Sequence, residues 1–287
     1  MTRRVALVTS AALPDLTEDD RLLVPALARV GVRAEPAVWD APGVAWDAFD
    51  AAVVRSPWDY FLRADAFRAW IDARDRRGPR LVNAAETLRW NLDKRYLGEL
   101  ERAGIPVVPT VYVARGEPAD IAARARVAGW TDLVVKPAVS GSAYRTIRVA
   151  AGDAEGEATA RAILRDGAAL IQPYMPEIVD GELSFVVVDG ELSHVVRKRP
   201  RPGDFRVQSE LGGTIERVVA DPALAAQARA CVAAAPGRPT YARVDGIVRA
   251  GRFVVMELEV LEPALYLAHD PEAPDRLAAA IAARVSG

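Results

Sequence analysis

Cysteine and histidine are almost absent from this chain of 287 residues. The single cysteine, Cys231, cannot form a disulfide within the chain, which is typical of proteins from the reducing cytoplasm. His194 and His269 stand in no Ser–His–Asp or Cys–His arrangement, so we do not expect nucleophilic hydrolase chemistry. No run reaches the roughly 20 apolar residues of a membrane span, and a net charge of −2 gives no field that attracts nucleic acid or membrane. We therefore expect a cytoplasmic protein without a nucleic-acid or membrane partner.

Lysine and asparagine are scarce too. Lys94, Lys136 and Lys198 are the only lysines among 37 Lys+Arg, and Asn83 and Asn91 are the only asparagines. Because arginine supplies nearly all of the positive charge, the remaining lysines are enriched at sites that need a compact ammonium group, such as phosphate-binding sites. The alternative is that the lysines are leftovers on a solvated surface. We rank it second, because each lysine has distinctive sequence neighbours.

The first 85 residues alternate short apolar runs with helical patterns. They predict strands at residues 5–9, 36–38 and 51–55 and helices around 20–30 and 64–76. This alternation is typical of an α/β layer with a parallel sheet, in which ligands gather at the carboxyl ends of the strands. The segment from Arg55 to Tyr60 follows the third strand and is therefore a candidate ligand-binding segment.

The rest of the chain predicts further strands and helices. One helix is expected over residues 85–102 with Lys94 midway, and strands and a helix alternate through residues 133–172. Asp189-Gly190 predicts a hairpin turn, and counting back from the turn pairs Glu182 with Arg197. A helix near 222–234, strands at 241–249 and 253–259, and a final helix from 274 follow. We divide the chain into residues 1–85, 86–173 and 174–287, an α/β fold with α+β subdomains.

Three carboxylates are the best candidates for a metal site. Glu257 and Glu259 are two apart in a predicted strand, so both side chains lie on one face. Together with Asp245 they would repel one another unless a cation lies between them, and oxygen ligands suit Mg²⁺ held with substrate phosphates. Asp245 can lie opposite Glu257 only if the connecting loop has odd length or one strand has a bulge. The alternative is an exposed strand face with acidic residues.

Two further segments offer groups that bind anions. Lys136 ends a predicted strand and precedes the small-residue loop Ser140-Gly141-Ser142, whose N–H groups can surround a polyphosphate. The spacing does not match a P-loop, and Ser/Gly loops are common. The second segment runs from Lys198 through Arg206 and Gln208 to Gly212 and Gly213. A Pro/Gly-constrained loop of this kind holds arginines against carboxylate or phosphate oxygens, although it can also be a basic surface loop.

Taken together, these segments resemble the ATP-grasp superfamily, in the branch of glutathione synthetase and the ribosomal-protein glutamate ligases. The resemblance spans residues 91–259 and implies ATP and Mg²⁺ as cofactors. It implies that Lys94 and Lys136 bind the phosphates, Gln172, Tyr174 and Met175 the adenine, and Glu182 the ribose, with Asp245, Glu257 and Glu259 as magnesium ligands. Pro173, Gln208 and Glu259 depart from the family pattern. Since Pro173 lacks an N–H, adenine must use that of Tyr174 or Met175. The resemblance also implies a substrate domain over 1–85, a lid over 86–173 and the metal site in 174–287.

More narrowly, the segments 55–60, 197–200 and 203–208 are similar to those of ATP-grasp cyclo-ligases that form cycloserine from O-ureido-D-serine. This resemblance implies that a carboxylate attacks the γ-phosphate of ATP and that an amine of the same molecule captures the acyl phosphate. It implies Arg206, Lys198 and Arg197 as catalytic residues and the following as substrate-binding residues: Arg55, Ser56, Trp58, Asp59, Tyr60, Gln208, Gly212 and Gly213. The partner is then a small amino-acid-like molecule, and a homo-oligomer is compatible with the sequence. An intermolecular amino-acid or peptide ligase and a non-catalytic nucleotide-binding protein are the alternatives.

Overall fold

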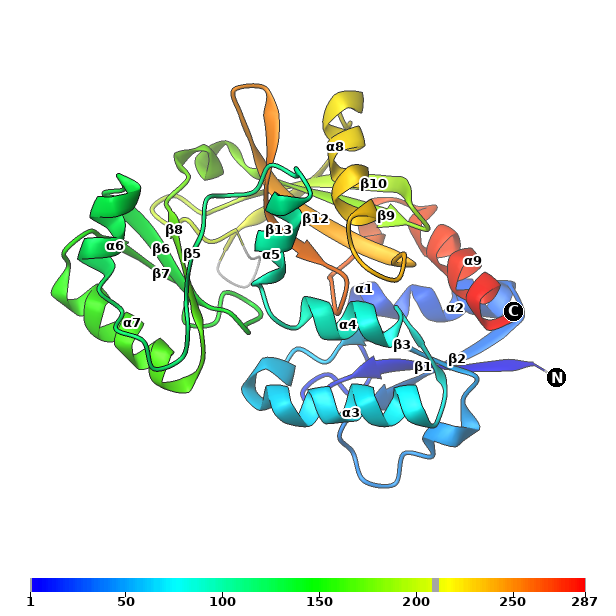
Figure 1. Cartoon of the computed structure of the whole chain (residues 1–287). Coiled ribbons are helices and arrows are strands. Elements are labelled where there is room, and N and C mark those ends of the chain that lie inside the picture. The colour runs from blue at the N-terminus through cyan, green and yellow to red at the C-terminus, as the bar shows by residue number, and fades with distance from the viewer. Residues whose placement is uncertain (1, 208–211, 287) are drawn as a thin grey trace.

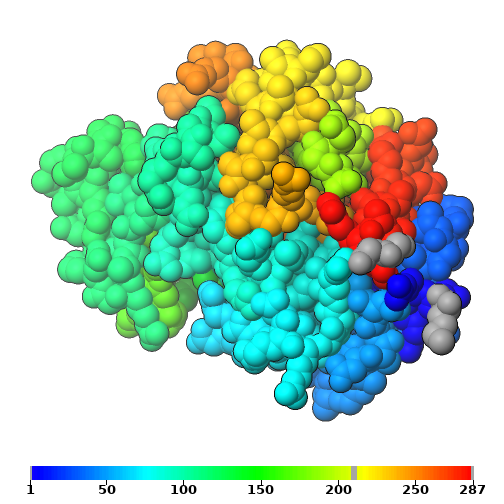
Figure 2. Space-filling model, turned by 45° about the vertical axis from the view of Figure 1, so that its right-hand side comes forward, coloured from blue at the N-terminus to red at the C-terminus, as the bar shows by residue number. Residues whose placement is uncertain are grey.

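The computed structural model contains three β-sheets, each covered by helices on one or both faces (Figure 1). It describes residues 2–207 and 212–286, the side chain of Ser286 excepted. Residues 111–173 form a lobe at one side of the space-filling view, drawn in green (Figure 2). The predicted α/β class is confirmed, with one parallel sheet and two antiparallel sheets. None of the helices in the described part of the chain is long and apolar enough to cross a membrane.

The N-terminal sheet is parallel, with the strand order β2-β1-β3-β4. Its strands alternate with helices, as the sequence predicts, and all six residues of β3 are buried because helices cover both faces. One face packs on α2 and α9 and the other on α3 and α4. The elements are β1 (Arg3–Thr9), α1 (Glu18–Arg21), α2 (Leu23–Arg29), β2 (Val32–Val38), β3 (Ala51–Ser56), α3 (Ala64–Arg76), β4 (Arg80–Val82), α4 (Ala85–Asn91) and α9 (Ala273–Ser286).

The middle sheet is antiparallel, with the order β5-β8-β6-β7. Leu133 and Val135 of β6 pack on the helices α6 and α7, so Val134 and Lys136 point to the opposite face. Asp153 caps the N-terminus of α7 by accepting the N–H groups of Glu155 and Gly156. The elements are β5 (Val111–Val113), α6 (Ile121–Ala128), β6 (Asp132–Pro137), β7 (Ile147–Ala150), α7 (Ala154–Asp166) and β8 (Ala169–Pro173).

The C-terminal sheet is antiparallel, with the order β11-β10-β9-β12-β13. Helices α5 and α8 cover one face, and Cys231 is buried there in α8. The short strand β11 was not predicted. The elements are α5 (Tyr96–Arg102), β9 (Glu182–Val188), β10 (Glu191–Arg199), β11 (Thr214–Val218), α8 (Pro222–Ala233), β12 (Tyr241–Arg249) and β13 (Arg252–Glu259). Helix α5 thus packs on this sheet although it lies in the predicted middle segment, and α9 packs on the N-terminal sheet.

The predicted continuous helix over residues 85–102 is wrong. It is two helices, α4 and α5, with Lys94 in the turn between them. The Asn91 side chain accepts the N–H groups of Val260 and Leu261, and the Lys94 N–H donates to the Ala138 carbonyl at 2.8 Å. These tertiary hydrogen bonds replace helical ones, and they bring Lys94 to the loop that follows β6.

The β9–β10 hairpin has the predicted turn but a different register. Val188 pairs with Glu191, and Asp189 and Gly190 have φ values of 49° and 84°, as a type I′ turn requires. A bulge between Leu192 and His194 then shifts the pairing by one residue. Glu182 therefore lies opposite Lys198, and the predicted pairing with Arg197 is wrong.

The β12–β13 hairpin confirms the pairing that the metal hypothesis required. The two-residue turn Ala250-Gly251 alone would place Asp245 opposite Met256. A bulge after Asp245 restores the pairing of Asp245 with Glu257 and of Arg243 with Glu259. Met256, which lies between the two glutamates in sequence, also lines the cavity described below.

Candidate active site

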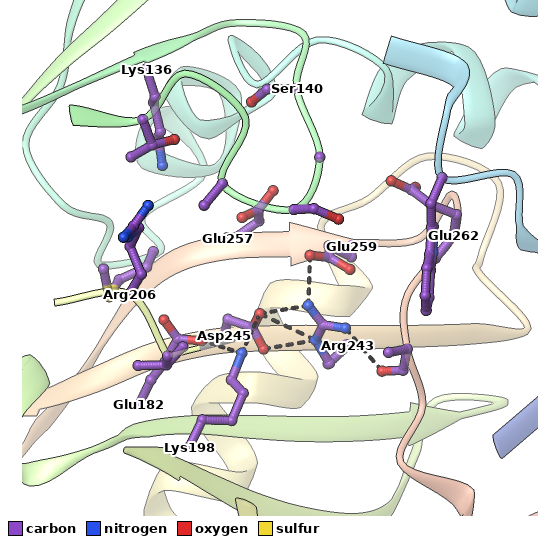
Figure 3. A pocket seen from close by; sticks show the side chains of 18 of the residues that line it. Lys136, Ser140, Glu182, Lys198, Arg206, Arg243, Asp245, Glu257, Glu259 and Glu262 are labelled. Atoms are coloured by element: carbon purple, nitrogen blue, oxygen red, sulfur yellow. Dashed lines mark hydrogen bonds and ion pairs between the residues drawn. The ribbon is translucent and has the colours of Figure 1, made fainter. Parts of the chain in front are cut away.

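A cavity of about 590 Å³ lies where the three sheets meet. It is lined from β6 and its following loop, from β9, β10, β12 and β13, and from the segment after β3 (Figure 3). Most of the predicted site residues line it: Trp58, Tyr60, Lys94, Lys136, Ser140, Gly141, Ser142, Gln172, Tyr174, Met175, Glu182, Lys198, Arg206, Asp245, Glu257 and Glu259. The fold therefore brings segments far apart in sequence to one place.

Lys94 and Lys136 point into this cavity from two sides and differ in their partners. Lys94 Nζ lies 3.0 Å from Glu257 Oε1 and donates to the Ser140 carbonyl. Lys136 forms no hydrogen bond or ion pair with any side chain in the described ranges, and burial lowers the pKa of its ammonium group. A buried ammonium group without a counter-ion is costly, which favours an anion beside it.

The loop after β6 packs against the N-terminal domain. A Cβ atom at Gly141 would lie 3.0 Å from Cδ1 of Phe61, so a larger residue there would have to displace the Phe61 ring. Ser142 has a φ of 49°, in the left-handed region. The loop thereby turns its backbone along the cavity beside Lys94.

The end of β8 and the residues that follow it contain the predicted adenine-binding residues. Gln172 is buried, and its Nε2 donates to Thr110 Oγ1 at 2.8 Å. The Tyr174 N–H donates to the Asp132 carbonyl at 2.8 Å. Of the two N–H groups that we considered for adenine, that of Tyr174 is thus already used, which leaves that of Met175.

A buried network of charges forms the floor of the cavity. Asp245 accepts hydrogen bonds from Ser184 Oγ at 2.6 Å, from Lys198 Nζ at 3.1 Å and from the Arg243 guanidinium. Lys198 also pairs with Glu182, which the bulge in β10 places opposite it. These two carboxylates raise the pKa of Lys198 despite its burial.

The three predicted magnesium ligands are not equivalent. Both oxygens of Asp245 are already bound by cationic donors, whereas Glu257 and Glu259 each present a carboxylate to the cavity with Oε1 paired. Among the described residues no three Asp, Glu, His or Cys side chains converge closely enough to hold a metal ion. Glu257 and Glu259 are therefore the donors that fit Mg²⁺ best, and Asp245 fits as their neighbour rather than as a third ligand.

The structure places six predicted residues outside the cavity lining: Arg55, Ser56, Asp59, Arg197, Gly212 and Gly213. Arg197 points to β11, where its guanidinium lies 3.6 Å from Glu216, because the bulge in β10 turns Lys198 toward the cavity instead. Ser56 is buried against Thr9, and Asp59 accepts a hydrogen bond from Trp39. Gly212 lies beside Arg201. Gln208 lies outside the described residues.

Arg55 is the largest departure from the sequence interpretation. Its side chain is fully buried, with Nε 2.9 Å from Asp20 Oδ1 and Nη2 2.7 Å from the Pro263 carbonyl. Its guanidinium also lies over the Tyr241 ring. The contact with Asp20 lies within the N-terminal domain, and those with Pro263 and Tyr241 join the N-terminal sheet to the C-terminal part of the chain, so the structure gives Arg55 a role in holding two parts of the chain together.

The comparisons with known proteins agree with this geometry. Residues 5–83 match the family described as the N-terminal domain of D-cycloserine synthetase DcsG, and residues 107–232 match the ATP-grasp domain of prokaryotic glutathione synthetase. The cycloserine biosynthesis protein DcsG of Streptomyces lavendulae is 34% identical over 300 residues, which cover 98% of each chain. The chain belongs to the DcsG family.

The solved structures give the same result. The crystal structure of D-cycloserine synthetase DcsG superposes with a TM-score of 0.90 at 31% identity, over 98% of this chain and 99% of that one. The D-alanine–D-alanine ligase from Bacillus anthracis superposes with a TM-score of 0.73 over 99% of this chain and 98% of that one. At 16% identity the second similarity concerns the fold alone. The predicted ATP-grasp fold is confirmed.

The cavity residues that sequence reasoning missed in this DcsG family member include Arg243 and Glu262. Arg243 lies two residues before Asp245 on the same strand face, a signal that the sequence did contain. It pairs with Asp245 and with Glu259 Oε1 at 2.6 Å. Glu262 follows β13 in a segment without regular structure, and no periodicity could have assigned its direction.

The raised pKa values of two cavity carboxyl groups predict that the stability of the folded protein depends on pH. Burial raises the pKa of Glu259 to about 8 and that of Glu262 to about 7. Because the folded protein holds these protons above the pKa of the unfolded chain, the stabilisation is complete below about pH 4.5 and is lost as pH rises through 7 to 8. We expect the melting temperature of the ligand-free protein to fall across this window and the Glu259→Gln variant to show a weaker fall. Glu272→Gln, at an exposed position, is the matched control, and equal slopes in both variants would contradict the prediction.

Proposed function

We propose that this protein is an ATP-dependent ligase that activates a carboxylate and closes O-ureido-D-serine to D-cycloserine. The observation that carries the proposal is the unpaired ammonium group of Lys136 in a cavity shared by three sheets, in a chain similar to DcsG along 98% of its length. The substrate is a small amino-acid-like molecule. Every residue role below is part of the proposal.

ATP binds with its phosphates between Lys136, Lys94 and the loop Ser140-Gly141-Ser142. The N–H of Met175 serves the adenine, since that of Tyr174 is bound within the sheet. Glu182 lies on the same side of the cavity as Arg206, away from Glu262 (Figure 3), which suits a contact with the ribose. These residues place the γ-phosphate toward Glu257 and Glu259.

Magnesium binds to Glu257 and Glu259 in this proposal. When bound, it offsets the negative charge that spreads over the transferring phosphoryl oxygens. Arg243 and Lys94 each hold one oxygen of these two glutamates, so the carboxylates are oriented before the ion arrives. Asp245 keeps Arg243 and Lys198 in place.

The substrate carboxylate takes the γ-phosphoryl group and becomes an acyl phosphate, which the oxygen-bound nitrogen of the ureido group in the same molecule captures; hydrolysis of the carbamoyl group on that nitrogen completes D-cycloserine. Arg206 lines the cavity and pairs only with Asp204 among the described residues, so its guanidinium is available to the acyl phosphate. Trp58 and Tyr60 form the wall at the substrate end. Holding amine and acyl group in one molecule supplies much of the rate through proximity.

The requirement for a second amino acid tests the proposal. Purified protein with Mg²⁺, ATP and O-ureido-D-serine should release phosphate and form D-cycloserine without an added amine. Removal of Mg²⁺ with EDTA should stop both, and excess Mg²⁺ should restore them. Phosphate release that needs a second amino acid and gives a linear amide would instead support an intermolecular ligase.

A further inference from the structure

The segment that follows β13, residues 260–265, is fixed by buried side chains from several elements. Most of its carbonyl groups accept a hydrogen bond from a side chain, and two of its N–H groups donate to Asn91 Oδ1. The donors are Asn83 to Val260 (2.7 Å), Trp58 to Glu262 (3.1 Å), Arg55 to Pro263 (2.7 Å), Arg243 to Ala264 (2.9 Å) and His194 to Leu265 (2.9 Å). Such a set of contacts holds irregular backbone as rigidly as a strand.

This segment presents one ionisable side chain to the cavity, that of Glu262. The residue is only 8% exposed, and the nearby Tyr60 side chain lowers the pKa of its carboxyl, which burial raises. A Cβ atom at Gly141 would lie 3.9 Å from Glu262 Oε1, so the carboxyl lies beside the loop after β6. In Figure 3 it lies beyond Glu259, on the side opposite to Lys136 and Arg206. Glu262 is therefore at the substrate end of the cavity.

Glu262 differs from the other carboxylates around the proposed phosphate site. Glu182 and Asp245 pair with Lys198, Glu257 with Lys94, and Glu259 with Arg243. Glu262 forms no ion pair with a described residue. Glu262 is therefore the one of these five carboxylates that is not held by a cationic side chain of the described residues, so its oxygens are available to a substrate nitrogen.

We propose that Glu262 is the general base of the ring closure, a role that rests on the proposed function. Its carboxylate accepts the proton of the substrate nitrogen as that nitrogen attacks the carbonyl carbon of the acyl phosphate. The C–N bond forms, the C–O bond to the phosphoryl group breaks, inorganic phosphate leaves with that bonding pair, and the proton ends on Glu262. Water later removes it. The ring nitrogen still carries the carbamoyl group of the ureido substrate, and hydrolysis by water releases this group as carbon dioxide and ammonia to give cycloserine. No oxidant is needed.

The charged and titratable groups around Glu262 suit this role. Burial has the largest influence on the Glu262 carboxyl and raises its pKa. The nearby Glu257 also raises this pKa, whereas Lys94, Tyr60 and Arg243 lower it. Glu259, on the adjacent strand, is also affected by Glu262. The result is a pKa of about 7, where a base is partly unprotonated at neutral pH and still binds a proton well.

The inference is tested by measuring how the acyl phosphate divides between ring closure and trapping by added hydroxylamine. Free hydroxylamine traps the acyl phosphate as a hydroxamate without help from an enzyme base, whereas ring closure needs Glu262. In Glu262→Gln we expect cycloserine formation to fall on the order of 10²-fold or more, with hydroxamate formation within about threefold of the wild type. Because both products form in one sample, their ratio does not depend on the folded fraction. Glu262→Asp should recover part of the ring closure, and it serves as the test variant if the glutamine variant does not fold.

The other possible outcomes reject either the role of Glu262 or the proposed function itself. If both products fall together, or if neither falls, Glu262 is not the base. If calorimetry shows that the Kd for the substrate rises while the product ratio stays at the wild-type value, Glu262 binds the substrate and the inference is wrong. If the wild type itself gives no hydroxamate, the proposed function fails before the variant is considered. Glu272→Gln, exposed on the same C-terminal part of the chain, should keep the wild-type ratio.

Discussion

Replacing Lys136 with methionine should lower ATP-dependent turnover on the order of 10²–10³-fold and leave the fold intact. The physical reason is that the Lys136 ammonium forms no direct ion pair with a described residue, and Glu257 and Glu182 attract it only from a longer distance, so its charge is available to phosphate oxygens. Methionine is an unbranched side chain only one atom shorter than lysine, and it removes the charge. Steady-state phosphate release and ATP affinity by calorimetry measure the effect.

The controls for this prediction separate charge from shape. Lys136→Arg should remain well below the wild type, because a planar guanidinium does not replace a compact ammonium group in a closed site. Arg161→Met, which removes a positive charge from an exposed position on α7, should leave turnover unchanged. Wild-type ATP affinity and turnover in Lys136→Met would remove this lysine from the phosphate site.

Arg55→Ala should destabilise the protein by about 3–5 kcal/mol, the usual loss when one member of a buried ion pair is removed. Asp20 would keep a buried charge without its partner, and the Pro263 carbonyl would lose its donor. Chemical denaturation monitored by circular dichroism measures the free energy of unfolding.

A double-mutant cycle makes this second prediction specific. Asp20→Ala combined with Arg55→Ala should cost less than the sum of the two single variants, because neither charge is then left unpaired. Arg21→Ala, on the exposed side of α1, is the control and should change stability little. If Arg55→Ala keeps wild-type stability and raises only the KM for the amino-acid substrate, Arg55 is the substrate clamp that its sequence position first indicated.

The sequence was sufficient wherever the pattern is local. The alternation in β6 separates Leu133 and Val135, which face helices, from Val134 and Lys136, which face the cavity. The two-residue spacing of Glu257 and Glu259 likewise predicts one face. Counting residues back from the turn showed that Asp245 can pair with Glu257 only if the loop has odd length or a strand has a bulge, and the structure contains that bulge.

The parts that failed depend on contacts between distant segments. The break before Lys94 exists because Asn91 binds the backbone at Val260 and Leu261, and no local signal marks it. The bulge in β10 that places Lys198 opposite Glu182 in place of Arg197 lies beside His194, whose Nε2 donates a hydrogen bond to the Leu265 carbonyl. Helix propensity and turn type could not contain this information, since both are properties of neighbours in sequence.

The same contacts between distant segments explain why asparagine is present at positions 83 and 91. Asn83 binds the backbone of Tyr241 and Val260, and Asn91 binds that of Leu258, Val260 and Leu261. An amide that donates and accepts at once is what such a backbone contact needs, and arginine or aspartate cannot do both. Both asparagines therefore fix the segment that carries Glu262.

Oxygen transfer from the substrate to phosphate tests the proposed reaction most directly. O-ureido-D-serine with both carboxylate oxygens as ¹⁸O is incubated with the protein, Mg²⁺ and ATP, and the products are analysed by mass spectrometry. Activation through an acyl phosphate predicts one ¹⁸O in the inorganic phosphate and one in the carbonyl of D-cycloserine. Phosphate that contains no ¹⁸O would contradict the proposed reaction, because the phosphoryl group would then have been transferred to water and not to the substrate carboxylate.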